Sequence, residues 1–233
     1  MDIVYSLGIS SLWDEVCHMP VGGVWWLNVD RHADAVSLLN HTLAAQDKQS
    51  QVAAIVMGEN PNKIIAPGKD RGPEKIALFS MPNRFEGLAE MHRDLVCSLE
   101  PGNYLFILLC AENAWQNIKS EDLCNWVEKS YRWTNYHRCS LLVLNSGHDI
   151  DKQLSPLLRE YRSLSGLASI RFQGDNHLFD IAWWGSEKGI SARQQLIILQ
   201  DENGWRLAQD EETVVQPRSD EKVILSNLRV LEG

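Results

Sequence analysis

The chain has 233 residues, of which 44% are hydrophobic and 23% are charged, a composition that excludes a wholly disordered protein. Its length allows one large domain or two small ones, each with a core. The formal net charge of −9 would repel phosphate backbones and bare anionic lipid, so neither nucleic acid nor a membrane surface is expected as a direct partner.

Cysteine usage and hydropathy indicate a reducing, aqueous compartment. The 5 cysteines form no C-x-x-C pair, which favours free, buried thiols over a metal site or disulfides. No apolar run approaches the ~20 residues of a membrane-spanning helix, and the N-terminus lacks a basic signal-peptide region. We therefore expect a cytoplasmic protein that reaches a membrane only through partners.

Up to residue 164, apolar runs of strand length alternate with helix-period stretches, a pattern typical of βαβ units. The predicted strands are 24–29, 52–57, 76–81, 104–110 and 140–144. The predicted helices are 31–46, 85–98, one with Ser120 as its N-cap, and 154–164. Because the strands are apolar on both faces, they predict a mostly parallel central sheet flanked by helices.

Beyond residue 165, short strands are predicted to follow one another without helices. They span 168–172, 178–184, 194–200 and 205–208, with hairpin turns at 174–176 and 202–204. The sheet of this α/β fold is therefore expected to end in antiparallel strands, and residues 1–210 to form one domain. The charged stretch after it predicts that 211–233 are a linker and the start of a following domain.

Two segments near the N-terminus resemble a known family. Residues 8–16, Gly-Ile-Ser-Ser-Leu-Trp-Asp-Glu-Val, are followed by Gly-Gly-Val-Trp-Trp-Leu at 22–27 and then by a predicted helix. This arrangement is similar to the opening of RecA- and KaiC-type ATPases, in which the strand leads into a phosphate loop of pattern G-x-x-x-x-G-K-[ST]. The resemblance implies a RecA-like, P-loop NTPase-type sandwich.

The phosphate-binding residues of those ATPases are replaced here. Laid on the chain without a gap, the loop falls on residues 29–36, where the glycines become Val29 and Asp34 and the lysine becomes Ala35. A phosphate loop needs glycines to turn consecutive N–H groups inward and a lysine to bind the β/γ-phosphates. We therefore expect no bound nucleotide, metal or other cofactor and no enzymatic activity. The degenerate position comprises Val29, Asp30, Arg31, His32, Asp34 and Ala35.

Other polar constellations are weaker. Arg31 and Asp34 have the R-x-x-D spacing of an inhibitory cyclic di-GMP site, so the alternative is a switch that binds ATP or cyclic di-GMP without turnover. Glu112, beyond the strand 104–110, could hold magnesium only opposite a lysine loop. Ser146, His148 and Asp149 are neighbours in sequence, whereas a hydrolytic triad converges from separate elements.

Two tryptophan pairs, Trp25–Trp26 and Trp183–Trp184, lie within predicted strands. Adjacent strand residues point to opposite faces, so each pair puts one indole on each side of the sheet. In a doubly covered sheet both indoles of a pair are expected to be buried. A role in an interface is the alternative.

Longer stretches are similar to a narrower family. They are SLGISSLWDE at 6–15, GGVWW at 22–26, EYRSL at 160–164, RFQGDNHLFDIA at 171–182, SARQQL at 191–196 and QPRSDEK at 216–222. Together they resemble the N-terminal domain of the BcsE family, regulators of cellulose secretion in enterobacteria. The resemblance covers essentially the whole chain.

That resemblance implies an assembly module. Members of the family bind cyclic di-GMP in a degenerate GGDEF-like domain after a degenerate receiver domain, so the principal dinucleotide site is expected beyond residue 233. The N-terminal domain is implied to form a homodimer, to bind the short membrane protein BcsF, and to help hold BcsR and BcsQ, or other cellulose synthase components, at the inner membrane. Which surfaces would do so is left open.

Overall fold

Within the part of the chain that the structure describes, strands alternate with four helices as far as residue 147, and only strands follow. The computed structural model describes residues 4–10, 18–66, 72–99, 102–111, 114–115, 118–147, 164–173, 176–184, 194–201 and 204–208. Its helices are α1 (His32–Ala44), α2 (Pro61–Ile64), α3 (Phe85–Ser98) and α4 (Ser120–His137). Its strands are β1 (Val4–Ser6), β2 (Ile9–Ser10), β3 (His18–Pro20), β4 (Val24–Val29), β5 (Gln51–Met57), β6 (Ile76–Met81), β7 (Tyr104–Cys110), β8 (Ser140–Ser146), β9 (Gly166–Gln173), β10 (Asn176–Trp184), β11 (Gln194–Asp201) and β12 (Gly204–Leu207).

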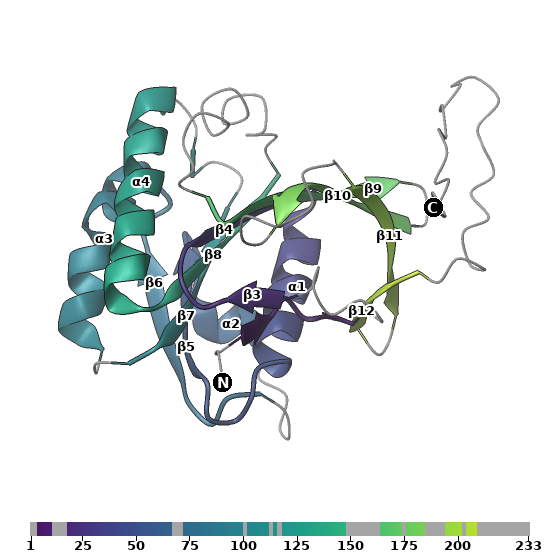
Figure 1. The fold of residues 1–233 in the computed structure, drawn as a ribbon, viewed down its shortest axis with the longest axis horizontal. Helices are drawn as coiled ribbons and strands as arrows, with labels where there is room; N and C mark the ends of the chain where they lie inside the picture. The colour runs from purple at the N-terminus through teal and green to yellow at the C-terminus, as the bar shows by residue number, and fades with distance from the viewer. Residues whose placement is uncertain are drawn as a thin grey trace, which may run out of the picture.

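One large sheet organises these elements (Figure 1). Within the described residues its strands follow the order β2-β12-β11-β10-β9-β4-β8-β7-β5-β6, while β1 pairs separately with β3. Strands β4 to β8 are mutually parallel, and β9 joins them alongside β4. From β9 to β12 every successive pair is antiparallel. The predicted α/β class, a mostly parallel sheet ending in antiparallel strands, is confirmed.

Helices cover both faces of the parallel strands (Figure 1). α1 packs on one face over a core that contains Trp25, and α3 and α4 pack on the other over a core that contains Trp26. Since adjacent strand residues point to opposite faces, β4 buries all of its side chains. Trp25 and Trp26 are 1% and 0% exposed, so this pair belongs to the core, as expected. The side chains of Trp183 and Trp184 lie outside the described part.

The core under α3 and α4 is built on indole rings. The Trp26 ring centroid lies 5.2 Å from that of Trp115 and 6.5 Å from that of Trp126. Trp126, on α4, also donates its Nε1–H to the carbonyl of Leu88 on α3 at 3.1 Å, which joins the two helices. The predicted Ser120 cap of α4 is wrong by one position. The extended N-cap residue is the one before it, and no side chain there caps the helix.

Gly8 fixes the N-terminal segment against α1. The Thr42 hydroxyl donates to the Leu7 carbonyl, and Gln46 Nε2 donates to the Ser6 carbonyl, each at 2.7 Å. Directly after Leu7, Gly8 has φ +80°, and a Cβ there would lie 2.5 Å from the backbone nitrogen of Thr42. Only glycine tolerates both the left-handed backbone and this close approach.

Most of the predicted elements are confirmed, four of them with the expected bounds (β4, β6, α3 and β7). The predicted helix 31–46 is present but shorter, from His32 to Ala44. β1, β2, β3 and α2 escaped prediction because elements of two to four residues are too short to show a period. The predicted helix up to residue 163, residues 174–175 and 202–203 of the hairpin turns, and 211–233 lie outside the described residues.

Candidate functional site at the end of strand β4

The predicted phosphate-loop position is a two-residue turn. Asp30 and Arg31 alone separate the end of β4 at Val29 from the start of α1 at His32. The phosphate-loop pattern instead has about six residues in its glycine-rich loop, enough to surround an anion with N–H groups. Val29 and Ala35 are 2% and 0% exposed, so a glycine position and the lysine position are occupied by core side chains.

Asp30 binds this turn to the neighbouring strand β9. Its N–H donates to the Ile170 carbonyl at 3.0 Å, and its carboxylate accepts the N–H of Phe172 at 3.0 Å. Both groups thereby extend the parallel pairing of β4 with β9, which otherwise ends at Val29 and Ile170. An amide that could face a phosphate is used here in the sheet.

Arg31 and Asp34 pair with each other across the first turn of α1. Arg31 Nε lies 2.6 Å from Asp34 Oδ2, and an Arg31 terminal nitrogen lies 3.1 Å from Oδ1, a bidentate arrangement. The backbone N–H groups of Asp34 and Ala35 both donate to the Arg31 carbonyl at 3.1 Å. The carboxylate therefore takes the favourable place beside the helix N-terminus that an anionic ligand would need.

Two rings from the antiparallel strands close over this pair. His177 Nε2, on β10, lies 3.2 Å from Asp34 Oδ2 and 3.3 Å from the Arg31 guanidinium. The guanidinium carbon lies 3.7 Å from the ring centroid of Phe172 on β9, a cation–π contact. His177 packs in turn against the Trp205 ring, with centroids 4.7 Å apart. We call Arg31, Asp34, Phe172 and His177 the Arg31 cluster.

Two further basic side chains at this end of the sheet also face carboxylates. Arg171 lies 2.7 Å from Asp180, and His32 Nε2 lies 2.7 Å from Glu59 Oε1. With the Arg31 pair, each of these three basic groups has an acidic neighbour within the chain. The site therefore offers an incoming phosphate little free positive charge.

Ser146, His32 and Glu59 lie in a row at this end of the sheet, but they do not form a catalytic triad. His32 Nδ1 lies 3.0 Å from Ser146 Oγ, on the opposite side of the ring from Glu59. Ser146 is 0% exposed, however, and its hydroxyl donates to the Cys110 carbonyl at 2.8 Å. A catalytic serine must instead be accessible and give its proton to the histidine. Of the other residues singled out from sequence, 112, 148 and 149 lie outside the described part.

The strongly shifted titratable groups are buried in the core. His92 is 4% exposed beneath α4, and burial followed by the positive charge of Lys129 lowers its pKa to about 4. Burial raises the pKa of the Cys139 thiol to about 12 and that of Cys110 well above its ordinary value. These groups are held in their neutral forms, which suits packing rather than proton transfer.

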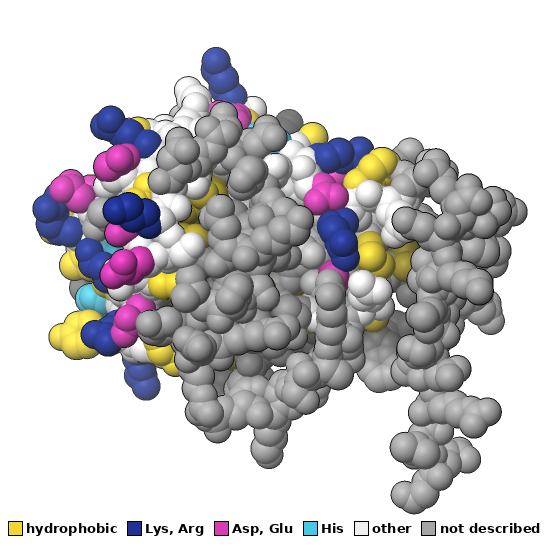
Figure 2. Space-filling view, turned by 90° about the horizontal axis from the view of Figure 1, so that it is seen from above, with side chains coloured by type: hydrophobic (Ala, Val, Ile, Leu, Met, Phe, Trp, Pro, Cys, Tyr) yellow, Lys and Arg dark blue, Asp and Glu magenta, His cyan; other side chains and the backbone are white. Residues whose placement is uncertain are grey.

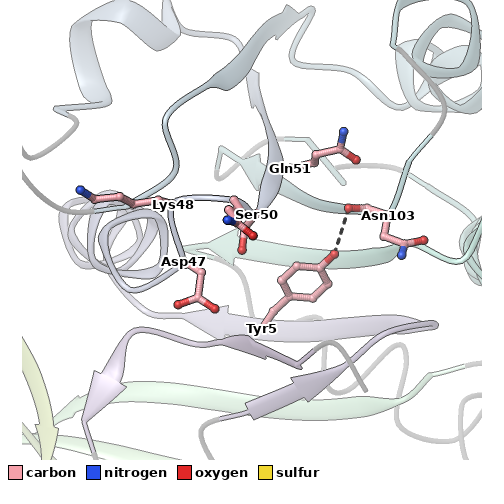
Figure 3. A pocket seen from close by; sticks show the side chains of 7 residues that line it. Tyr5, Asp47, Lys48, Ser50, Gln51 and Asn103 are labelled. Atoms are coloured by element: carbon pink, nitrogen blue, oxygen red, sulfur yellow. Dashed lines mark hydrogen bonds between the residues drawn. The ribbon is translucent and has the colours of Figure 1, made fainter. Parts of the chain in front are cut away.

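A hollow of about 620 Å³ lies at the opposite end of the sheet, where β5 and β7 begin (Figure 3). The Tyr5 hydroxyl donates across it to the Asn103 carbonyl at 3.2 Å. Burial raises the pKa of this phenol to about 12. Open α/β sheets bind ligands at the carboxyl ends of their strands, whereas this hollow lies at the amino ends of β5 and β7. The lining residues are Tyr5, Asp47, Lys48, Gln49, Ser50, Gln51 and Asn103.

Comparison with known proteins now decides the family. Residues 1–206 match the family described as cellulose biosynthesis protein BcsE, N-terminal domain. The chain belongs to this BcsE N-terminal domain family. It is 74% identical over its whole length to a cyclic di-GMP binding protein BcsE of Klebsiella pneumoniae, and 60% and 58% identical to those of Escherichia coli K12 and Salmonella typhimurium. It spans 45% of the length of each of these relatives.

The fold of this BcsE N-terminal domain is RecA-like. The crystal structure of the RadB recombinase matches it with a TM-score of 0.57, over 81% of this chain and 92% of the recombinase, at 10% sequence identity. Both resemblances drawn from the sequence are thus confirmed. Among the described helices none is long and apolar enough to cross a membrane, and the described residues hold no cluster of three metal-ligating side chains.

Sequence reasoning located this turn but missed the residues that close it. Phe172 and His177 lie in a stretch that resembles the family, yet no role followed for either. His177 is 143 positions from Asp34, so no local spacing could signal their contact. Glu59 follows β5 as an ordinary loop carboxylate and shows its partner only once β5 and β4 are placed in the sheet.

Proposed function

We propose that this BcsE N-terminal domain is a non-catalytic assembly module of a cyclic di-GMP-responsive regulator of cellulose secretion. It associates with a second copy of itself and brings the regulator to the membrane-bound synthase. Its further partners in this proposal are the membrane protein BcsF, and BcsR and BcsQ or other synthase components. It is cytoplasmic and peripheral to the inner membrane through those partners.

The observation that carries the non-catalytic part is the closed turn between β4 and α1. Its two residues supply no cradle of N–H groups, and Arg31 is already bound in bidentate fashion by Asp34. An incoming phosphate would have to break that pair and would regain only one half-exposed cation. A RecA-like fold without its phosphate site has lost the nucleotide but keeps large outer surfaces, which favours a role in assembly.

Calorimetry of the 233-residue chain with Mg-ATP and with cyclic di-GMP tests this part. We expect no binding tighter than about 10 μM, roughly −7 kcal/mol. Tighter binding of either nucleotide that disappears in Arg31→Ala would establish the alternative, a switch that binds nucleotide without turnover. Arg93→Ala, an exposed arginine of α3, is the matched control and should leave any heat signal unchanged.

Sedimentation velocity and membrane recruitment test the assembly part. We expect the chain to be dimeric at micromolar concentration and to bind vesicles only when they carry BcsF. Retention of BcsR and BcsQ on an affinity-tagged chain tests the remaining partners. A strict monomer at every concentration would remove self-association from the proposal, and equal binding to vesicles without BcsF would remove recruitment through that partner.

A further inference from the structure

Strand β6 forms one end of the large sheet and lacks the usual protection of an edge. It pairs with β5 on one side, and no described strand lies beyond it. Its six residues, Ile-Ala-Leu-Phe-Ser-Met, include no charge, proline or glycine. Natural edge strands are normally short, bulged or charged, because an uncovered edge is a template for another strand. The opposite end of the same sheet is β2, only two residues long.

The outward hydrogen-bonding groups of β6 can be assigned from a single contact. The Gly58 N–H donates to the Met81 carbonyl at 2.8 Å, so Met81 directs its backbone groups toward the β5 side. Backbone N–H and C=O groups alternate in direction along a strand. Ile76, Leu78 and Ser80 therefore direct theirs away from β5. These residues give the outer edge three evenly spaced donors and three acceptors.

The side chains of β6 are matched for pairing with themselves. Leu78 is 37% exposed, one of the few large hydrophobic residues so exposed in the described part. In an antiparallel pair centred on this residue, Leu78 faces Leu78 of a second copy and Ile76 faces Ser80. On the other side of the sheet, the large Phe79 faces the small Ala77. No like charges are opposed, and three hydrogen-bonded residue pairs make about six backbone bonds.

The neighbouring helical surface has a different character. Figure 2 shows basic and acidic side chains interleaved over the side of the molecule formed by α3 and α4. Arg93 pairs there with Glu90 on α3, and Arg132 pairs with Glu128 on α4. Mixed charges of this kind are typical of a solvated helix face. The contrast singles out the uncharged edge.

We propose that the outer edge of β6 pairs antiparallel with β6 of a second copy of this chain, across a two-fold axis at Leu78. The two large sheets then become continuous. This inference rests on the self-association proposed above and names the surface that performs it. A second copy fits better than a foreign peptide because the edge is self-complementary, and an isologous contact needs no other partner.

A charge exchange at the two-fold axis tests the geometry. Leu78→Lys and Leu78→Glu each place like charges opposite each other, so each variant alone should lose at least about tenfold in dimer affinity by sedimentation velocity. Mixing the two should restore dimers, since lysine then faces glutamate. Val96→Lys, at a 49% exposed hydrophobic residue on α3, is the control and should dimerise like the parent chain. Unchanged far-UV circular dichroism establishes that each variant folds.

Each outcome decides the proposal. Loss of dimers in both variants with recovery on mixing supports it. Dimers that persist in both variants overturn it and leave self-association standing through another surface, and loss without recovery on mixing also overturns it. A monomeric parent chain removes the surface and the self-association together. Variants that dimerise normally but no longer bind BcsF-bearing vesicles would assign the edge to the membrane partner instead.

Discussion

The contribution of the Arg31–Asp34 ion pair to the stability of the domain can be tested quantitatively. Only 8% of the Asp34 side chain is exposed, whereas Arg31 is 46% exposed. Removal of the arginine leaves a buried carboxylate with His177 as its remaining close partner. Removal of the carboxylate charge leaves a cation that water can reach. The two substitutions should therefore differ in their cost to stability.

We expect Arg31→Ala to lower the free energy of unfolding by about 3 kcal/mol, since stripping one partner from a buried pair costs about 3–5 kcal/mol and this pair is partly open to water. Loss of the contact with Phe172 contributes to that figure. Asp34→Asn keeps the side-chain size and should cost about 1–2 kcal/mol. At about 2–4 °C per kcal/mol for a domain of this size, Tm should fall by about 6–12 °C for Arg31→Ala and by less for Asp34→Asn.

Urea unfolding followed by tryptophan fluorescence measures these differences, and an unchanged m-value indicates that the unfolded states are comparable. Arg93→Ala breaks a pair whose arginine is 68% exposed and should leave the free energy of unfolding unchanged within the error of the measurement. The reasoning is refuted if Arg31→Ala behaves like that control, or if Asp34→Asn costs more than Arg31→Ala.

Three further results are expected. The His92 pKa of about 4 lies below its ordinary value of 6.5, so the unfolded chain takes up the proton first as the pH falls. The contribution of His92 to stability is therefore full above pH 6.5 and is lost as the pH drops from 6.5 to 4. Measured across that range, the free energy of unfolding of His92→Gln should depend much less on pH than that of the parent chain. Gly8→Ala should destabilise by about 3 kcal/mol or more in urea unfolding, and Gly22→Ala by about 1 kcal/mol, because both have positive φ but only the Gly8 Cβ meets helix backbone. In a variant with Cys17 replaced by serine, a thiol reagent should label the exposed Cys97 within minutes. The buried Cys110 should react only when the chain unfolds. Rapid labelling of Cys110 in the folded chain would contradict its burial.

Local sequence was sufficient for the parallel part of the fold and for the loss of the phosphate loop. The runs that became β6, α3 and β7 carry their own periodicity and turn signals, so their bounds followed without knowledge of their neighbours. Valine and alanine in place of glycine and lysine are facts of residue type, and the prediction that this position binds no phosphate follows from the chemistry of the loop alone. The burial of Trp25 and Trp26 followed in the same way from strand alternation.

The side chains that surround Arg31 and Asp34 at the degenerate phosphate-loop position could be identified only from the tertiary structure. Asp34 meets His177, and Arg31 stacks on Phe172, because β9 lies beside β4 in one register and β10 beside β9 in another. In the same way, nothing within Ile76–Met81 marks β6 as the end of the sheet, since this follows from the placement of β7 on the far side of β5. Strand order and register are set by the free energy of packing between residues distant in sequence, and a short stretch of sequence contains no information on those contacts.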